Sequence, residues 1–381
     1  MNFRTLNRAY GSAGTTHQTP IIWLGQNLRN RVLLAEHDEL KSSPILVSMG
    51  DAFLRPSYKD RFFTEHLRES LGMTGPLMVD SGGYALLARR SLRCSIKELE
   101  RIYLKLPADI LVSLDCPPSP SDDQVKRSTL RRRTLRNLEI LSHIIPPERL
   151  MPVAHGHTVK EVERSCEAIK LLCPNASQIG MGGLVPLIRS GGSVGGFRYV
   201  RKNGTPGDRG QWIGDAIEIV HAYFPQALVH VFGVGSATTA IGVLALGADS
   251  ADSLSWRRVA NYGAILLPGR SERFPLFCEE RVHSRPVLRD EDLGLVAACE
   301  CPVCSLTNNI PKRLSALAGC YKHRAIHNAW TVLTEVAALR TAIKTNRVRA
   351  FLTSRLSARH RLYKPVIERL NACETVQGSI P

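Results

Sequence analysis

Residues 109–115 read DILVSLD, a short apolar run that ends on a carboxylate, and runs of this kind recur along the chain. Because they are apolar throughout rather than alternating, they are typical of strands buried on both faces of a parallel sheet. A helical pattern follows each of them. The eight runs are Pro44–Met49, Pro76–Asp80, Asp109–Asp115, Leu150–His155, Gln178–Gly183, Leu228–Gly235, Ala248–Asp252 and Gly263–Pro268. Eight strands alternating with helices predict an α/β fold of the (β/α)8 TIM-barrel type.

Polar residues or glycines end six of the predicted strands. They are Asp80, Asp115, His155, Gly183, Gly235 and Asp252. In a (β/α)8 barrel the carboxyl ends of the strands form the face on which active sites are built. An ordinary strand-end cap is the alternative explanation for one or two of these residues. Three aspartates at three strand ends nevertheless predict an active site at this face.

A cysteine run lies beyond the predicted barrel. Cys299, Cys301 and Cys304 fall within six residues, and His327 follows farther along the chain. Three thiolates and one imidazole supply the four ligands of a closed tetrahedral Zn²⁺ site, in which the metal is structural because no coordination position stays open. Free thiols in a turn are the alternative. We therefore expect the barrel to carry an inserted zinc-binding subdomain and C-terminal helices.

The composition limits where the protein works and what it binds. A formal net charge of +16 on 381 residues predicts a polyanionic partner, with nucleic acid favoured. A generally basic surface is the alternative. The first residues lack an apolar signal segment, and no apolar run is long enough to span a membrane, so we expect neither export nor membrane insertion. The remaining cysteines are scattered, which indicates a reducing, cytoplasmic location.

The predicted organisation has four parts. Residues 1–40 form an N-terminal extension, 41–290 the barrel catalytic domain, 291–345 the zinc-binding subdomain with a helix, and 346–381 a basic C-terminal tail. Within the barrel, the long Gly-rich loop Leu187–Trp212 carries basic and aromatic side chains suited to phosphate contacts and base stacking. Its candidate nucleic-acid contacts are Arg198, Arg201 and Lys202. A loop that is merely mobile is the alternative.

A set of motifs resembles the tRNA-guanine transglycosylase superfamily and follows the family's order. The motifs are Asp80–Tyr84 (DSGGY), Asp115–Pro118 (DCPP), Gly182–Leu184 (GGL), Phe232–Gly235 (FGVG), Gly247–Asp252 (GADSAD) and the group Cys299, Cys301, Cys304 and His327. The resemblance extends from about residue 40 to residue 345. Enzymes of that family are zinc-containing (β/α)8 barrels that exchange a guanine in nucleic acid for a 7-deazaguanine base, and they commonly dimerise near the zinc region.

The resemblance implies a role for each aspartate. Asp252 would be the nucleophile that attacks the sugar C1′, and Asp80 the general acid and base. Asp115 would accept the N–H protons of the purine. The other substrate-binding residues that it implies are Ser81, Gly82, Gly83, Tyr84, His155, Gly182, Gly183, Leu184 and Gly233. The chemistry agrees, because glycosidic exchange with retention needs one nucleophilic carboxylate and one that moves protons.

Three alternatives accompany these assignments. Asp249 competes with Asp252 as nucleophile, although in a strand the two side chains point to opposite faces unless a bulge intervenes. His155 and His157 could be metal ligands, but a base contact or a core position is the better interpretation. Phe232–Ser236 resembles a dinucleotide loop only weakly, because the third glycine of that fingerprint is missing.

Several positions depart from the tRNA enzymes. Ala85 stands where they have Gln, residues 155–157 read HGH in place of QGG, and residues 253–258 read SLSWRR. This pattern resembles the DpdA-type DNA-guanine transglycosylase branch, so DNA is the expected substrate and tRNA the runner-up. Arg257 and Arg258 are further expected nucleic-acid contacts. A non-catalytic nucleic-acid-binding subunit is a third hypothesis, and a homodimer or other modification-system proteins are expected partners.

Overall fold

The computed structural model describes residues 9–10, 17–28, 32–83, 85, 95–119, 121–184, 199–200, 206–275, 286–358 and 360–377. Its centre is a sheet of nine strands whose neighbours all pair in parallel, in the order β7-β6-β5-β4-β3-β13-β12-β9-β8. The strands are β3 (Ile21–Gln26), β4 (Ile45–Ser48), β5 (Leu77–Asp80), β6 (Ile110–Val112), β7 (Leu150–Met151), β8 (Val153–Ala154), β9 (Gln178–Met181), β12 (Leu228–Val231) and β13 (Ser250–Ser253).

The two ends of this sheet belong to one stretch of chain. β7 pairs with β6 and β8 pairs with β9, and Pro152 alone separates β7 from β8. Proline has no N–H to give to the ladder, which explains the break between the two short strands. The Pro152 carbonyl still accepts from the Gly180 N–H at 2.8 Å. The sheet therefore closes into a barrel with eight strand positions, as the sequence predicted.

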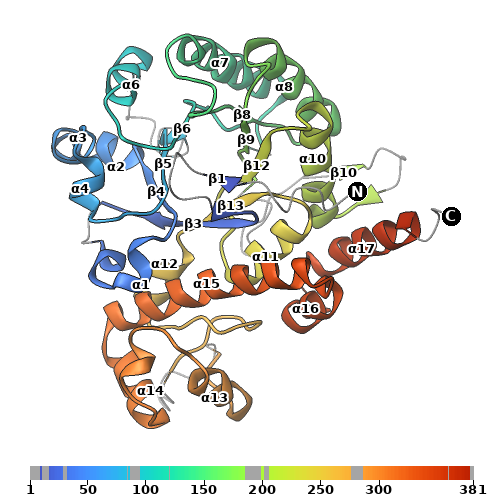
Figure 1. Ribbon diagram of the computed structural model, residues 1–381. Coiled ribbons are helices and arrows are strands. Elements are labelled where there is room, and N and C mark those ends of the chain that lie inside the picture. Colours follow the sequence, from blue (N-terminus) through green and yellow to red (C-terminus); the bar gives the residue numbers. More distant parts are fainter. Residues whose placement is uncertain are drawn as a thin grey trace.

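Helices surround this barrel on the outside (Figure 1). They are α1 (Asp38–Lys41), α2 (Gly50–Leu54), α3 (Pro56–Phe62), α4 (Leu67–Leu71), α6 (Ile96–Tyr103), α7 (Gln124–Ser142), α8 (Val159–Leu172), α10 (Arg209–Tyr223), α11 (Ala237–Ala245) and α12 (Ser255–Asn261). Polar side chains that follow strand ends begin several of them. Thr158 caps α8 and Ser236 caps α11 by accepting backbone N–H groups, which fixes the loops between strand and helix.

The alternation of side chains along each strand divides the core in two. One cluster fills the barrel interior and includes Trp23, Met78, Val112 and Met151, whereas a larger cluster lies between the strands and the helices. The same alternation turns Ser48, Asp80 and His230 inward near the strands' carboxyl ends, because each stands two residues from an interior apolar position. Asp252 faces the same way, because it pairs with the interior residue Trp23 of β3. The fold thus places polar groups at the carboxyl-terminal end of the apolar barrel interior.

The structure corrects the predicted strand series at both ends. Ile21–Gln26, which lies inside the stretch assigned to an N-terminal extension, is the barrel strand β3 between β4 and β13. Gly263–Pro268, predicted as the eighth strand, joins none of the barrel strands and makes only an isolated antiparallel bridge, Ile265 to Arg273. Its apolar residues are buried beside the C-terminal helices instead, so burial without sheet pairing produced the misleading apolar run.

The C-terminal part forms a lobe and a long helix beside the barrel. Its elements are α13 (Asp290–Ala297), η4 (Cys304–Leu306), α14 (Ile310–Gly319), α15 (Tyr321–Lys344), α16 (Val348–Arg355) and α17 (Tyr363–Gln377). Helix α15 packs along α12 and separates the barrel from the lobe of α13 and α14 (Figure 1). Among the described residues, no helix has the length and apolar character needed to cross a membrane.

Candidate active site and metal centre

Asp252 lies on β13 near its carboxyl end, with its side chain inside the barrel. Its Oδ1 accepts the Gly233 backbone N–H at 2.6 Å and lies 3.5 Å from Nε2 of His230. Gly233 has a φ of 68°, a backbone conformation that favours glycine, and this turn after β12 aims its N–H at the carboxylate. One oxygen of Asp252 is therefore held by the protein, whereas Oδ2 accepts no hydrogen bond from the described residues, and the side chain is 13% exposed.

Asp249 lies at the opposite end of the same strand. It precedes β13, and its Oδ2 accepts the Val229 N–H at 2.8 Å, at the point where β12 begins. The side chain is 2% exposed. Its bonding joins two strands at the amino-terminal face of the barrel, where conserved positions of this fold serve stability rather than chemistry. Of the two competing aspartates, only Asp252 reaches the mouth of the barrel, which is the end where the carboxyl termini of the strands lie.

Asp80 ends β5 and lies near the carboxylates of Asp115 and Asp252. Its Oδ2 accepts the Ser48 hydroxyl at 2.7 Å and the Gly82 N–H at 3.1 Å. Burial, and then the neighbouring charge of Asp115 with a smaller effect of Asp252, raises the pKa of Asp80 to about 7. The two hydrogen bonds oppose that rise but do not cancel it. Asp80 can therefore gain or lose a proton near neutral pH, as a general acid and base must.

Asp115 and His155 form a pair beside Asp80. Oδ2 of Asp115 lies 3.0 Å from Nε2 of His155, and Oδ1 is 3.5 Å from the Ser81 hydroxyl. Both side chains are buried. A Cβ on Gly83 would lie 2.0 Å from Oδ1 of Asp115, so this position admits only glycine next to the carboxylate. Gly83 thus leaves space for Asp115, and Ser81 lies within reach of its carboxylate.

Gly182 makes room for His155, and Gly183 follows it in a left-handed backbone conformation. A Cβ on Gly182 would lie 2.3 Å from Cε1 of the imidazole, and Gly183 has a φ of 76°. Leu184, which follows them, is buried. Since Gly182 and Gly183 leave backbone in place of side chains, a planar ligand could approach that backbone. The structure brings these residues and the three aspartates to the same end of the barrel.

The remaining predicted contacts divide into three groups. Tyr84, Arg198, Arg201 and Lys202 lie outside the described residues. Arg258 is exposed on α12, as a nucleic-acid contact must be. Arg257 is buried, however, with its Nε donating to the Tyr321 hydroxyl at 3.1 Å and its guanidinium over the Trp256 ring. This packing of α12 against α15 contradicts the prediction that Arg257 contacts nucleic acid.

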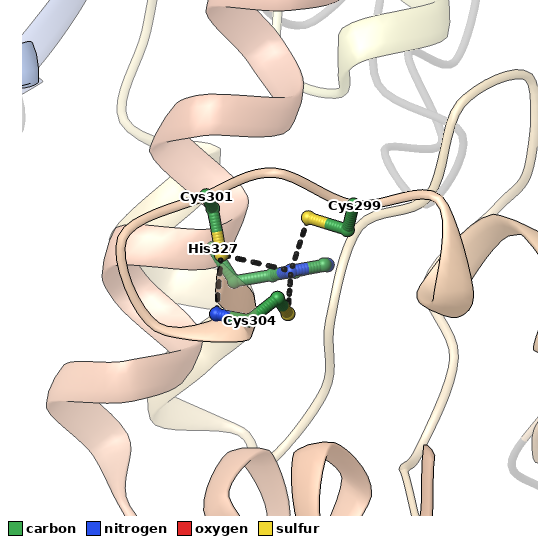
Figure 2. A group of neighbouring side chains, drawn as sticks. All are labelled: Cys299, Cys301, Cys304 and His327. Carbon is green, nitrogen blue, oxygen red and sulfur yellow. Dashed lines mark hydrogen bonds between the residues drawn. The ribbon is translucent and has the colours of Figure 1, made fainter. Parts of the chain in front are cut away.

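The four predicted metal ligands come together in one cluster (Figure 2). The ligand atoms of Cys299, Cys301, Cys304 and His327 all lie within 4.8 Å of one another. Nδ1 of His327 is 3.4, 3.7 and 3.5 Å from the three sulfurs in that order. Within the described part of the chain this is the one group of such residues that could hold a metal ion, and neither His155 nor His157 belongs to it.

The surroundings of the cluster fit a bound metal such as zinc. Nε2 of His327 lies 3.0 Å from the Leu266 carbonyl, which fixes the proton on Nε2 and turns Nδ1 toward the sulfurs. The Cys304 N–H donates to the Cys301 sulfur at 3.3 Å, which favours a thiolate. Asn328, the next residue, donates to the Trp256 carbonyl and accepts the Leu266 N–H. His327 is therefore tied to the segment that follows α12, and its neighbour Asn328 to α12 itself.

Sequence reasoning missed two residues of the mouth. Ser48 donates to Asp80, and His230 lies beneath Asp252, wholly buried in the barrel interior. Both occupy inward positions of strands that otherwise read as apolar runs. A polar residue at such a position is the signal that could have found them, because the barrel interior of a strand admits polar groups chiefly where they serve the site.

The fold and the site together define a class. A closed parallel barrel that gathers three carboxylates at the carboxyl ends of its strands belongs to the (β/α)8 class, in which this face is where active sites are built. The particular family follows from comparison with known proteins. The model of the queuine tRNA-ribosyltransferase family matches residues 10–361, and the chain belongs to this family.

Three archaeal proteins with curated names are among its relatives. The chain is 25% identical over 363 residues to the tRNA-guanine(15) transglycosylase of Pyrococcus furiosus, a match that covers 92% of this chain and 54% of the relative. For the enzyme of the same name in Thermococcus kodakarensis the identity is 24% over 376 residues, covering 97% and 58%. For that of Methanopyrus kandleri it is 26% over 323 residues, covering 80% and 61%. The chain spans little more than half the length of these relatives.

Proposed function

We propose that the protein is a base-exchange transglycosylase that replaces guanine in a nucleic acid with a 7-deazaguanine base by double displacement. The observation that carries this proposal is that the surroundings of Asp252 and Asp80 differ. Asp252 has one oxygen held and one free to attack, and Asp80 has a pKa of about 7 that suits proton transfer. Membership of the family supports it.

In the first displacement, Oδ2 of Asp252 bonds to the sugar C1′ while the C1′–N9 bond breaks. Asp80 gives its proton to the departing guanine, whose electron pair comes from the broken bond. The result is a covalent glycosyl ester on Asp252. Because the guanine must leave the base stack to reach this buried mouth, the target nucleotide is turned out of the nucleic acid before reaction.

In the second displacement, Asp80 is a carboxylate and takes the N9 proton of the incoming base. The base attacks C1′, and the ester bond to Asp252 breaks, which returns the carboxylate. Two inversions give net retention at C1′. Asp115 reads the purine edge in both steps, because guanine presents its N1–H and its amino group as donors.

The Cys₃His cluster would hold Zn²⁺ with a structural role. Four protein ligands fill a tetrahedral coordination sphere, so a bound zinc ion would supply cross-linking of the lobe to the barrel rather than chemistry at the mouth. The chain's own residues do the binding and the proton transfer.

For the nucleic acid we propose tRNA, in place of the DNA substrate expected from the sequence departures. The curated relatives are named for tRNA, which supports this choice. Duplex DNA is the second candidate, as in the DpdA-type branch. It is favoured by His155, which stands where the tRNA enzymes have a glutamine and pairs with Asp115 beside the expected position of the base. Exposed Arg258 and the net charge of +16 suit either polyanion.

The test is nucleoside mass spectrometry after incubating the protein with 7-cyano-7-deazaguanine and either unmodified tRNA or duplex DNA. We expect a modified ribonucleoside in the tRNA digest and none after Asp252→Ala. A modified deoxynucleoside alone would transfer the proposal to DNA. If neither nucleic acid is modified and labelled guanine does not exchange into either, the protein is a non-catalytic binding subunit and the proposal is wrong.

A further inference from the structure

His230 is the polar residue deepest inside the barrel near the proposed nucleophile. It lies on β12, paired with Ser250 of β13 on one side and Gly180 of β9 on the other. Its side chain is wholly buried. The Phe232 ring meets the imidazole edge-on at 4.4 Å, and Gly180 leaves the space for that ring, because a Cβ there would lie 2.5 Å from it. The imidazole is therefore held in one orientation.

The two ring nitrogens of His230 have different surroundings. Nδ1 lies 2.8 Å from the Ser250 hydroxyl. Nε2 points at Oδ1 of Asp252 from 3.5 Å and, among the described residues, makes no hydrogen bond. A buried ring nitrogen rarely stays unpaired, and a carboxylate accepts rather than donates. The arrangement that satisfies both groups has Ser250 donating to Nδ1 and Nε2–H directed at Asp252.

We propose that His230 is a positioning residue for Asp252, in a chain Ser250–His230–Asp252. The Nε2–H and the Gly233 N–H both meet Oδ1, the oxygen that does not attack, and this holds Oδ2 toward the sugar C1′. The same two donors stabilise the carboxylate when the glycosyl ester breaks and its charge returns. The 3.5 Å contact shortens to a hydrogen bond in the complex, as contacts in empty active sites commonly do. This inference rests on the proposed function, in which Asp252 is the nucleophile.

The enzyme assay compares two histidine–aspartate contacts of the same barrel. His230→Phe keeps a ring but removes the donor to Asp252. The matched control is His221→Phe, because Nε2 of His221 lies 3.8 Å from Oδ2 of Asp249 at the other end of β13. We expect His230→Phe to lower the turnover number of guanine exchange about 100-fold with the KM for guanine unchanged. His221→Phe should retain the wild-type turnover number.

A conservative variant separates positioning from packing. His230→Gln restores an N–H donor of similar reach and should recover most of the turnover lost in His230→Phe. Wild-type turnover in His230→Phe, or equal losses in both phenylalanine variants, would overturn the inference. Asp252→Ala is run beside them. If that variant exchanges guanine as fast as wild type, or if wild type exchanges none, the proposed function has failed rather than the role of His230.

A spectroscopic measurement tests the contact between His230 and Asp252 directly. It requires neither catalytic turnover nor a His230→Phe variant that folds. In protein carrying ¹⁵N-labelled histidine, the His230 ring should show a protonated Nε2 and a bare Nδ1. The Nε2 signal should shift in Asp252→Asn and stay in Asp249→Asn. A bare Nε2, or a signal indifferent to Asp252→Asn, would contradict the proposed contact.

Discussion

The mouth of the barrel and the Cys₃His lobe both gather anionic ligand atoms, but they treat them in opposite ways. In the lobe, the donors of Cys299, Cys301, Cys304 and His327 converge within 4.8 Å, and the far nitrogen of the imidazole is already bonded to the Leu266 carbonyl. At the mouth, three carboxylates lie near one another, and burial together with the charges of Asp115 and Asp252 raises the pKa of Asp80 to about 7.

This difference distinguishes reactive groups from other buried polar groups. A closed ligand set has a complete coordination sphere and stabilises the fold. A set in which Asp252 keeps one oxygen without a hydrogen bond from the described residues and Asp80 has a pKa of about 7 is poised for reaction, at some expense in stability. The predictions that follow test each half of this contrast, beginning with the largest effect.

Removing the nucleophilic oxygen should have the largest effect. Asp252→Asn is expected to lower guanine exchange by about 10⁴-fold or more, as loss of a nucleophile does in other enzymes. The measurement is incorporation of labelled guanine into tRNA. The control is Asp249→Asn, the same change at the other end of the strand, which should lower the melting temperature but not the turnover number. Comparable turnover losses in both would remove the distinction between the two aspartates.

Opening the ligand set should destabilise the lobe. Cys301→Ser is expected to lose the bound metal and to lower the free energy of unfolding by roughly 5 kcal/mol, because metal binding and folding are coupled. Zinc content and urea denaturation measure the two effects. Cys320→Ser, a change at a cysteine outside the cluster, should alter neither. Full metal content and unchanged unfolding in Cys301→Ser would show that the cluster is not a closed metal site.

Neutralising Asp80 should separate stability from activity. The folded protein holds a proton on Asp80 up to a pKa of about 7, whereas the unfolded chain releases it near 3.8. The contribution of this group to stability is therefore present at low pH and is lost as the pH rises from about 4 through about 7. Asp80→Asn is uncharged at every pH, so at pH 8 it should be more stable than wild type by up to about 4 kcal/mol.

The same variant should lose exchange by roughly 10²- to 10⁴-fold, since asparagine cannot transfer the proton. Denaturation at pH 5 and pH 8 measures the stability effect, with Asp38→Asn as the exposed control. A stability gain that does not grow between these pH values would mean that Asp80 is an ordinary carboxylate.

The smallest expected effect concerns the pair at the base edge. His155→Gln removes the imidazole from Oδ2 of Asp115 and leaves that oxygen free to accept from guanine. One recovered hydrogen bond should lower the KM for guanine by about tenfold at most. His157→Gln is the matched control, because His157 is a buried histidine two residues away whose backbone N–H donates to Glu161 at 2.8 Å. An unchanged KM in His155→Gln would exclude the pair from base recognition.

Most of the site could be predicted because its signals are local. The aspartates end strands whose apolar runs are visible in the sequence, and the close spacing of three cysteines with His327 farther along supplies four ligands. The prediction of strands failed for two segments, because burial of a segment does not determine whether it pairs in the sheet. Gly263–Pro268 is as apolar as a strand yet packs beside α15, whereas Ile21–Gln26 is a strand at a place where the sequence suggested an extension. Hydrophobicity reports burial and cannot report which backbone a strand pairs with.

Two side-chain roles depend on register rather than on composition. Arg257 belongs to a basic segment, but the turn of α12 directs it against Tyr321 instead of toward solvent. His230 sits in an apolar run and comes near Asp252 only through the pairing of β12 with β13. Neither could be inferred before the strands and helices were placed.

The central claim is that Asp252 forms the covalent bond to the sugar. Its most direct test is to incubate the protein with tRNA and, in parallel, duplex DNA, denature without added base, and map any cross-linked peptide by mass spectrometry. The account predicts a glycosyl adduct on Asp252 that disappears when guanine or 7-cyano-7-deazaguanine is added before denaturation. An adduct on Asp249 or Asp80, or an adduct that persists in Asp252→Asn, would contradict it.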